Sequence, residues 1–118
     1  MCSMRPEDRD AAYLWDMREA ARTTRGLVAG MDLAAFLEDR RTQLAVERAL
    51  ELVGEAARRV SPSFREAHPG LPWRAIVGLR NVLAHDYGEV DPSRVYAVAT
   101  RDVPALLSAL ETLLPPEP

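Results

Sequence analysis

The chain has 118 residues, the size of one ordinary domain, which is enough to bury a single modest core. Its 18 alanines and 15 leucines, against one isoleucine and five threonines, favour helices over sheets. The formal net charge of −3 argues against a protein that coats nucleic acid through a broad basic face. It leaves room for a small site that grips one or two phosphates with arginine, which supplies all 15 basic residues.

Two further features bear on where the protein works. No apolar run approaches the roughly 20 residues that a membrane span requires, and the N-terminal segment lacks the apolar stretch of a secretory signal. The single cysteine, Cys2, cannot form an internal disulfide and fits a reducing cytosol. We therefore expect a cytoplasmic protein with no membrane segment.

The first predicted element is a long N-terminal helix. It opens near Pro6, which is acceptable in a first turn, and runs toward Gly26, with a break at Gly30. Asp32 can cap a short helical piece after that break. The apolar positions of the long helix fit one packed face: Ala11, Leu14, Trp15, Met17 and Ala21.

A second long helix is predicted from Asp39 to Val60. Its apolar residues follow one stripe: Ala45, Ala49, Leu52, Val53, Ala56 and Val60. An acidic stripe follows another face: Glu47, Glu51 and Glu55. Because like charges one turn apart repel each other, we expect a counter-charge such as Arg48 nearby. Gly54 costs this helix about 1 kcal/mol relative to alanine, and a close approach of another helix would explain its presence.

The remainder of the chain predicts three more helical pieces. The segment 63–66 has the pattern of a capping box, which favours a single helical turn. A third principal helix starts at Pro72 and ends by Gly88, and Asp91-Pro92 opens a final helix to about Leu114. Pro104 should kink or split that last helix. The sequence thus predicts an all-α bundle of four principal helices, forming a single domain over residues 1–118.

Polar residues with catalytic potential are concentrated between Arg80 and Tyr87. Arg80 carries a permanent charge and a planar fork of donors suited to a phosphate. His85 titrates near neutral pH and can exchange a proton during phosphodiester cleavage, and Asn81, one helical turn before it, can orient the imidazole. Tyr87 can donate to a phosphate or serve as the nucleophile for a modifying enzyme.

Spacing alone leaves two interpretations of this cluster open. In a straight helix Arg80 and His85 differ by about 140° in azimuth and ~7.5 Å in rise. Convergence on one phosphate would need the long arginine side chain, a loosened helix end near Gly88, or two copies that meet at a dimer interface. We favour the dimer, since it brings two arginines and two histidines into one cleft. A salt-bridging arginine and a capping or core-edge histidine are nevertheless the commoner explanation of this spacing.

No competing catalytic constellation appears in the sequence. It holds no glycine-rich phosphate loop and no Cys/His spacing typical of metal ligands, so we expect neither a cofactor nor a metal. His68 precedes a proline in a connector and is expected to be an exposed loop residue. Glu55 can position Arg48 or Arg80, or it can have a structural helix-capping or interhelical role.

At the polar cluster the chain resembles a known family. The segment 80–87 is similar to the R-x-x-x-x-H-x-Y motif of HepT-type toxins in the HEPN superfamily. Residues 46–56, which end in Gly-Glu-Ala, resemble that family's second-helix signature. Residues 71–73 and 78–81 resemble its Pro-Trp and Arg-Asn stretches, and 90–91 after the tyrosine fit as well. The similarity covers essentially the whole chain.

The resemblance implies a fold, an activity and roles for four of these residues. It implies an α-helical homodimer that cleaves RNA without a metal, with the motif in a cleft at the dimer interface. Arg80 would bind the scissile phosphate and stabilise its developing charge. His85 would assist attack by the ribose 2′-hydroxyl or protonate the leaving 5′-oxygen, with Asn81 and Tyr87 as supporting residues.

The resemblance also implies a partner. In a HepT/MntA-type (type VII) toxin–antitoxin system, a minimal nucleotidyltransferase antitoxin, MntA, would transfer AMP from ATP to Tyr87. The added AMP would neutralise the toxin, because it places a phosphate and a bulky base where RNA must enter. The alternative is a non-catalytic HEPN accessory or substrate-binding subunit of a minimal nucleotidyltransferase.

Overall fold

The computed structural model describes residues 6–79, 83 and 89–114 of the chain. The described residues form helices joined by short connections and contain no β-strand, which confirms the all-α prediction. The elements are α1 (Pro6–Val28), α2 (Leu33–Glu38), α3 (Arg40–Arg59), α4 (Pro62–Ala67), α5 (Trp73–Val77), α7 (Pro92–Ala97), η1 (Val98–Asp102) and α8 (Val103–Leu113). Within these ranges, none of the helices is both long and apolar enough to cross a membrane.

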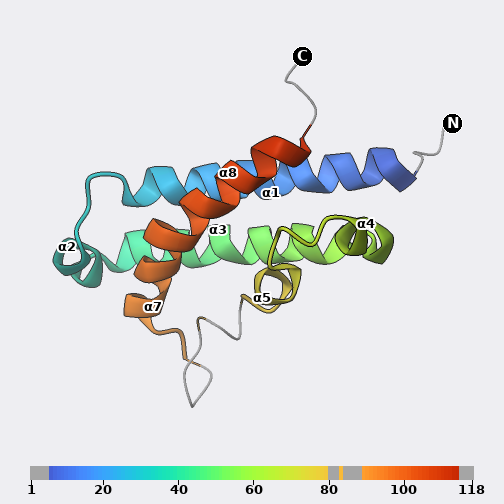
Figure 1. Cartoon of the computed structure of the whole chain (residues 1–118). Coiled ribbons are helices and arrows are strands. Elements are labelled where there is room, and N and C mark those ends of the chain that lie inside the picture. Colours follow the sequence, from blue (N-terminus) through green and yellow to red (C-terminus); the bar gives the residue numbers. More distant parts are fainter. Residues whose placement is uncertain (1–5, 80–82, 84–88, 115–118) are drawn as a thin grey trace, which may run out of the picture.

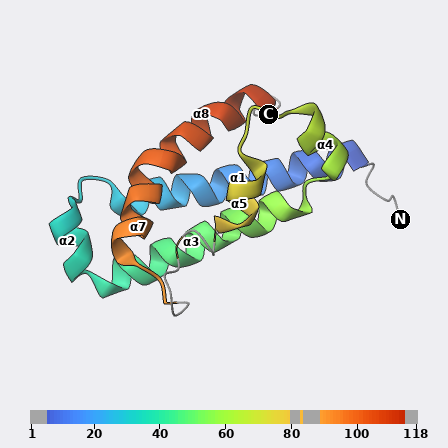
Figure 2. The same ribbon diagram turned by 60° about the horizontal axis from the view of Figure 1, so that its bottom comes forward.

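The long helices α1 and α3 form the centre of the molecule. They lie side by side and run in opposite directions, with α2 at the end where the chain reverses (Figure 1). The last helices cover this pair from one side: α7 contacts α2 and α3, and α8 lies across α1. A second view shows α4 and α5 beside the C-terminal half of α3 (Figure 2). The bounds of α1 and α3 agree with the two long helices that the sequence predicts.

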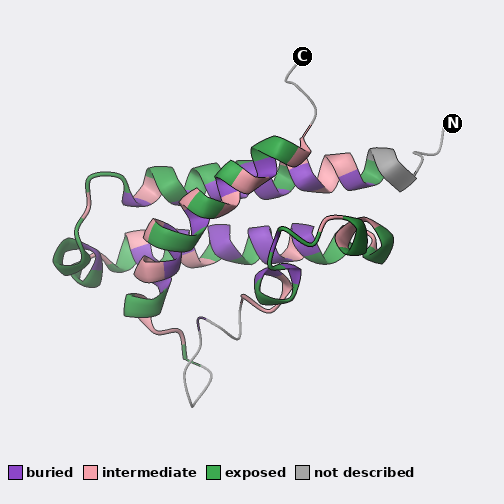
Figure 3. Ribbon diagram, viewed as in Figure 1, coloured by how far each residue is buried: buried purple, intermediate pink, exposed green. Residues whose placement is uncertain are grey.

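The hydrophobic core lies where α1, α3 and α8 meet (Figure 3). Fully buried side chains from these helices include Met17, Leu50 and Leu110. The stripe predicted for α3 is partly wrong, because Leu52 is 40% exposed, and the buried positions include Val46 and Leu50 instead. Apolar residue type alone did not indicate that the neighbours of α3 would leave Leu52 at the edge of the packed face.

Side-chain caps explain where α2, α3, α4 and α7 begin. The Asp39 carboxylate accepts a hydrogen bond from the Thr42 N–H (2.9 Å) at the start of α3, and Asp32 caps α2 in the same way. The predicted cap Asp91 accepts from the Ser93 N–H, which confirms the start of α7. The capping box predicted at 63–66 is wrong: α4 is capped by Ser61, because Pro62 already has the fixed backbone angle of a first helical residue.

The predicted split at Pro104 is present. The final helical run is divided into α7, the π-helical segment η1 and α8, with Pro104 in the first turn of α8. Proline has no N–H to donate to the carbonyl four residues earlier, and its ring crowds that carbonyl. The wider π turn accommodates this, and the Val103 N–H donates to the Val98 carbonyl, five residues back.

The helix predicted from Pro72 to Gly88 is interrupted. Helix α5 ends at Val77, where the Gly78 N–H donates to the Arg74 carbonyl at 2.9 Å and closes a turn. Glycine is a poor helix former, which explains why the chain leaves the helix here. Beyond Leu79, most of the predicted helix lies outside the described residues.

Candidate functional site

The four motif residues predicted to carry the chemistry lie outside the described residues: Arg80, Asn81, His85 and Tyr87. The structure does describe the residues that surround the motif in the chain, namely Leu79, Leu83 and the segment from Glu89 onward. It also describes Glu55, the fifth residue assigned to the site. The contacts of these described residues show how the chain on either side of the motif is held in the fold.

Leu83, between Arg80 and His85 in the chain, is tied to the fold in two ways. Its side chain is 3% exposed and belongs to the hydrophobic core. Its backbone carbonyl accepts a hydrogen bond from the Asp91 N–H at 2.9 Å. Because the Asp91 side chain caps α7, this contact links the middle of the motif to the start of α7. The sequence showed the capping role of Asp91 but gave no signal for its bond to Leu83.

Helix α5 leads directly into the motif and is anchored at both ends. At its start the Trp73 indole N–H donates to the His68 carbonyl at 2.8 Å, and the ring meets Phe64 edge-on. At its end, Gly54 of α3 faces the last turn of α5. A Cβ atom at Gly54 would lie 3.1 Å from the Ile76 carbonyl oxygen. The close approach expected at Gly54 is thus present, and its partner is backbone.

His68 differs from its prediction as an exposed loop residue. It is half-buried, its ring stacks on Phe64 with centroids 4.1 Å apart, and its Nδ1 lies 3.0 Å from the Phe64 carbonyl oxygen. The neighbouring proline indicated a connector, but it did not show that α4 would bring Phe64 under the imidazole. His68 therefore has a structural role next to α5.

Glu55 belongs to a surface charge cluster on α3. The Arg48 Nη1 lies 3.2 Å from Glu51 Oε2 and 3.5 Å from Glu55 Oε1. This confirms that Arg48 supplies the expected counter-charge and that Glu55 contacts it. All three side chains are between 44% and 61% exposed, so solvent screens the pairs and they contribute little to stability. The other expected partner of Glu55, Arg80, lies outside the described residues.

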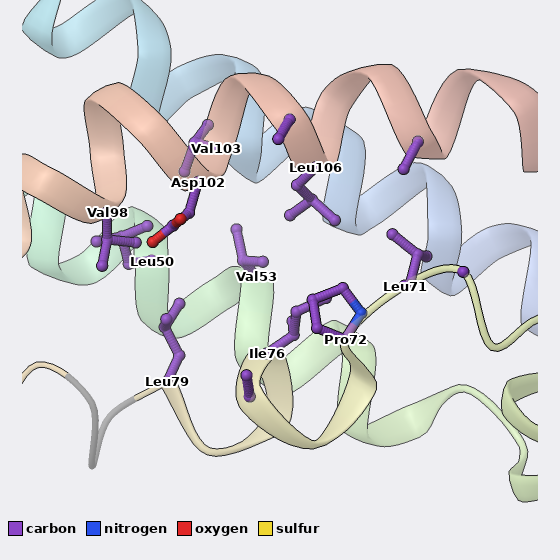
Figure 4. Close-up of a pocket in the computed structure, with 14 residues that line it drawn as sticks. Leu50, Val53, Leu71, Pro72, Ile76, Leu79, Val98, Asp102, Val103 and Leu106 are labelled. Atoms are coloured by element: carbon purple, nitrogen blue, oxygen red, sulfur yellow. The ribbon is translucent and has the colours of Figure 1, made fainter.

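A cavity of about 340 Å³ opens between α3, α5 and α8 (Figure 4). Leucine, valine, isoleucine, alanine and proline side chains dominate its lining, and Asp102 is the charged residue among them. Such a wall offers no cationic donors to a phosphate, so the cavity does not fit a polynucleotide backbone. It does border the motif, because Leu79 lines it. Among the described residues, no group of three or more His, Cys, Asp or Glu could hold a metal ion.

Comparison with known proteins gives consistent matches over most of the chain. The family model HepT-like, described as "Ribonuclease HepT-like", matches residues 17–113. "Probable ribonuclease HepT" of Thermococcus cleftensis is 36% identical over 101 residues, which cover 86% of this chain and 92% of that protein. "Putative RNase MJ1380" of Methanocaldococcus jannaschii is 36% identical over 100 residues, 85% of this chain and 92% of that protein. No solved structure gives a significant match.

Proposed function

The chain belongs to the HepT-like family, and on this basis we propose that it is a metal-independent endoribonuclease formed by a single HEPN domain over residues 1–118. The observation that carries the proposal is the extent of the family match, which runs from α1 to α8 and includes an intact Arg80-x₄-His85-x-Tyr87 motif. The polar chemistry of those residues suits phosphodiester cleavage.

In the proposed reaction the ribose 2′-hydroxyl attacks the adjacent phosphorus and the bond to the 5′-oxygen breaks. Arg80 binds the phosphate and stabilises the charge that develops on its oxygens. His85 exchanges the proton, either by assisting the 2′-hydroxyl or by protonating the leaving 5′-oxygen. Asn81 orients the imidazole or contacts the substrate. The products are a 2′,3′-cyclic phosphate and a 5′-hydroxyl end.

The proposed active unit is a homodimer. Arg80 and His85 point in different directions on a straight helix, and two copies that meet at the motif would place both residue types around one linkage. Glu55, which contacts Arg48 on the exposed face of α3, has a supporting role in this proposal.

We test the ribonuclease proposal with purified wild type, Arg80→Ala and His85→Ala on a labelled RNA, in the presence of EDTA. Removal of the histidine should lower the cleavage rate by about 10²–10⁴-fold and removal of the arginine by about 10²–10³-fold. The matched control is Arg25→Ala, an exposed arginine at the end of α1. It should cleave at the wild-type rate per folded molecule.

The products and the substrate sugar give a second readout of the same mechanism. Cleavage should leave cyclic phosphate ends, and a 2′-deoxy sugar at the cleaved position should block it, because the attacking hydroxyl is missing. Equal cleavage by all four proteins, or loss of wild-type cleavage in EDTA, would contradict the proposal.

The proposed biological setting is a HepT/MntA-type toxin–antitoxin pair, in which a minimal nucleotidyltransferase modifies Tyr87. The tyrosine oxygen attacks the α-phosphate of ATP, loses its proton and displaces pyrophosphate, so that AMP remains on the side chain. A phosphate and a base at this position would obstruct the entry of RNA.

We expect the neighbouring gene to encode a minimal nucleotidyltransferase. Co-expression with that gene product, followed by intact-mass measurement, tests this setting. Wild type and the control Tyr13→Phe should gain AMP units and lose ribonuclease activity, whereas Tyr87→Phe should keep its unmodified mass. AMP on the Tyr87→Phe protein would refute the acceptor assignment. A wild-type protein that binds the nucleotidyltransferase but never cleaves RNA would favour the alternative, a non-catalytic accessory subunit.

A further inference from the structure

Helix α5 approaches Gly54 so closely that a Cβ atom there would be in tighter contact than most Cβ atoms are. A Cβ at residue 54 would meet the Ile76 carbonyl oxygen at 3.1 Å, the Val77 carbonyl oxygen at 3.8 Å and the Leu79 Cβ at 3.9 Å. Ordinary contacts of a Cβ atom lie at 3.4–4 Å, so the contact with the Ile76 oxygen would have to lengthen by a few tenths of an ångström. The atom that has to move belongs to the backbone, so a change of side-chain rotamer cannot relieve the contact.

The position of α5 depends on such contacts. A helix of five residues cannot hold its own place, because isolated helices of this length are unstable. Trp73 fixes its start, and the fit against Gly54 fixes its last turn. The turn that follows is also tight, since a Cβ at Gly78 would lie 3.2 Å from the Arg74 carbonyl oxygen.

We propose that Gly54 is a positioning residue for the catalytic centre: by letting the last turn of α5 lie against α3, it sets the backbone from which Arg80 extends. The three residues that a Cβ at Gly54 would touch are Ile76, Val77 and Leu79, and Leu79 is joined to Arg80 by one peptide bond. Because these residues lead into Arg80 along the chain, a shift of them should slow a reaction that depends on Arg80. This inference rests on the proposed ribonuclease function.

Gly54→Ala and Gly26→Ala form a matched pair of variants. Gly26 lies in α1 and is exposed, and a Cβ at this position would meet nothing within 4 Å. The same substitution there adds helix propensity without a new contact. For Gly54→Ala, single-turnover cleavage by excess enzyme should be about tenfold slower, since small misplacements of catalytic groups are costly. Its melting temperature should change little, because the gain in helix propensity offsets the contact.

A comparison of the single-turnover cleavage rate with the RNA affinity distinguishes a positioning role from an effect on stability. RNA affinity, measured in a His85→Ala background, should be nearly unchanged by Gly54→Ala, whereas the single-turnover rate per folded molecule falls. Gly26→Ala should match wild type in both. A wild-type rate for Gly54→Ala, or a rate loss that only follows the folded fraction, would overturn the proposal.

Two further measurements test the proposal if Gly54→Ala does not fold or if wild type does not cleave RNA. If Gly54→Ala does not fold, Gly78→Ala changes the end of α5 without changing α3, because its Cβ would lie 3.2 Å from the Arg74 carbonyl oxygen, and it should show the same slowed rate. If wild type cleaves no RNA, the proposed function fails on its own. Backbone amide shifts at residues 76–79 that change with Gly54→Ala and not with Gly26→Ala would then still support the packing; unchanged shifts would refute it.

Discussion

Asp39 shows how one side chain both starts a helix and acquires a pH dependence. Its carboxylate accepts hydrogen bonds from the Thr42 N–H at 2.9 Å and from the Thr42 hydroxyl at 2.7 Å. These bonds favour the charged form and hold the pKa of Asp39 below its ordinary value of 3.8, with the backbone bond the larger cause. A pKa that is lower in the folded protein than in the unfolded chain stabilises the fold above the unfolded pKa.

The stabilisation from Asp39 should therefore depend on pH in one direction. It is fully present at neutral pH and is lost as the pH falls from about 4 through the lowered pKa of the folded state. We expect Asp39→Ala to melt below wild type at pH 7, and the gap to shrink steadily at pH 4 and below. Thermal denaturation over this range measures it, with the exposed neighbour Glu38→Ala as control. A gap that widens in acid would contradict the assignment.

At the scale of elements, α7 is tied to the start of the chain through Tyr96. The Tyr96 hydroxyl donates to the Met31 carbonyl at 2.8 Å, in the connection between α1 and α2. Its ring packs against the buried Phe36, with centroids 5.4 Å apart. This bond spans 65 residues of sequence and joins the C-terminal helices to the turn between the long ones.

Tyr96→Phe should keep the ring contact and remove the hydrogen bond. We expect the free energy of unfolding to fall by about 1 kcal/mol, the usual net contribution of one such bond. Urea denaturation followed by circular dichroism measures the loss, and Tyr13→Phe in α1 is the matched control. Equal stability of Tyr96→Phe and wild type would show that water replaces the lost partner at Met31.

Local signals in the sequence predicted the elements where the cause is local. The Asp91-Pro92 pair starts α7, and Pro104 divides the final helix, because both effects depend on a few neighbouring residues. The exposure of Leu52 was missed, since it depends on which elements pack nearby. The end of α5 was missed although Gly78 was a local signal for it. Gly54 was partly predictable. A glycine in the middle of a helix lowers its stability, which indicated a close approach of another helix, but the sequence could not show that the partner is the backbone of α5.

For the candidate site, the motif residues could be named from the sequence, whereas the contacts of the residues around them required the structure. The motif from Arg80 to Tyr87 was identified through the resemblance to HepT-type proteins, because residue types and spacing alone leave a structural role open. The anchoring of Leu83 by the Asp91 N–H was not predicted, because a backbone bond carries no sequence signature. The stacking of His68 on Phe64 was missed for a similar reason: it requires the placement of α4 against the connector.

At the scale of the whole molecule, helices α2 and α3 expose leucine side chains on the surface. In the described part of the chain, four leucines on these helices are at least 40% exposed: Leu33, Leu37, Leu44 and Leu52. Burial of a leucine side chain is worth roughly 1.5–3 kcal/mol, so these residues can stabilise an association. Leu44 and Leu52 lie on the same helix as the Arg48–Glu55 contact.

The proposed homodimer predicts the mass of the protein in solution. Light scattering should report twice the chain mass of 13.1 kDa for wild type. If the leucine-bearing surface contributes, Leu44→Glu should weaken the dimer by about 10- to 100-fold in Kd, since losing 1.4 kcal/mol costs one factor of ten. Ser108→Glu, at an exposed position of α8, is the control. A wild-type mass of one chain would refute the dimer, and an unaffected Leu44→Glu dimer would refute this surface.

The placement of α8 across α1 has a consequence for biosynthesis. Helices α1 and α3 leave the ribosome first and can pair while translation continues, but the part of α1 that α8 covers stays open until α8 itself has been made. A nascent chain that stops before Val103 would expose the part of α1 that α8 otherwise covers to chaperones or proteases. Synthesis of α8 and closure of the core are thus coupled in this protein.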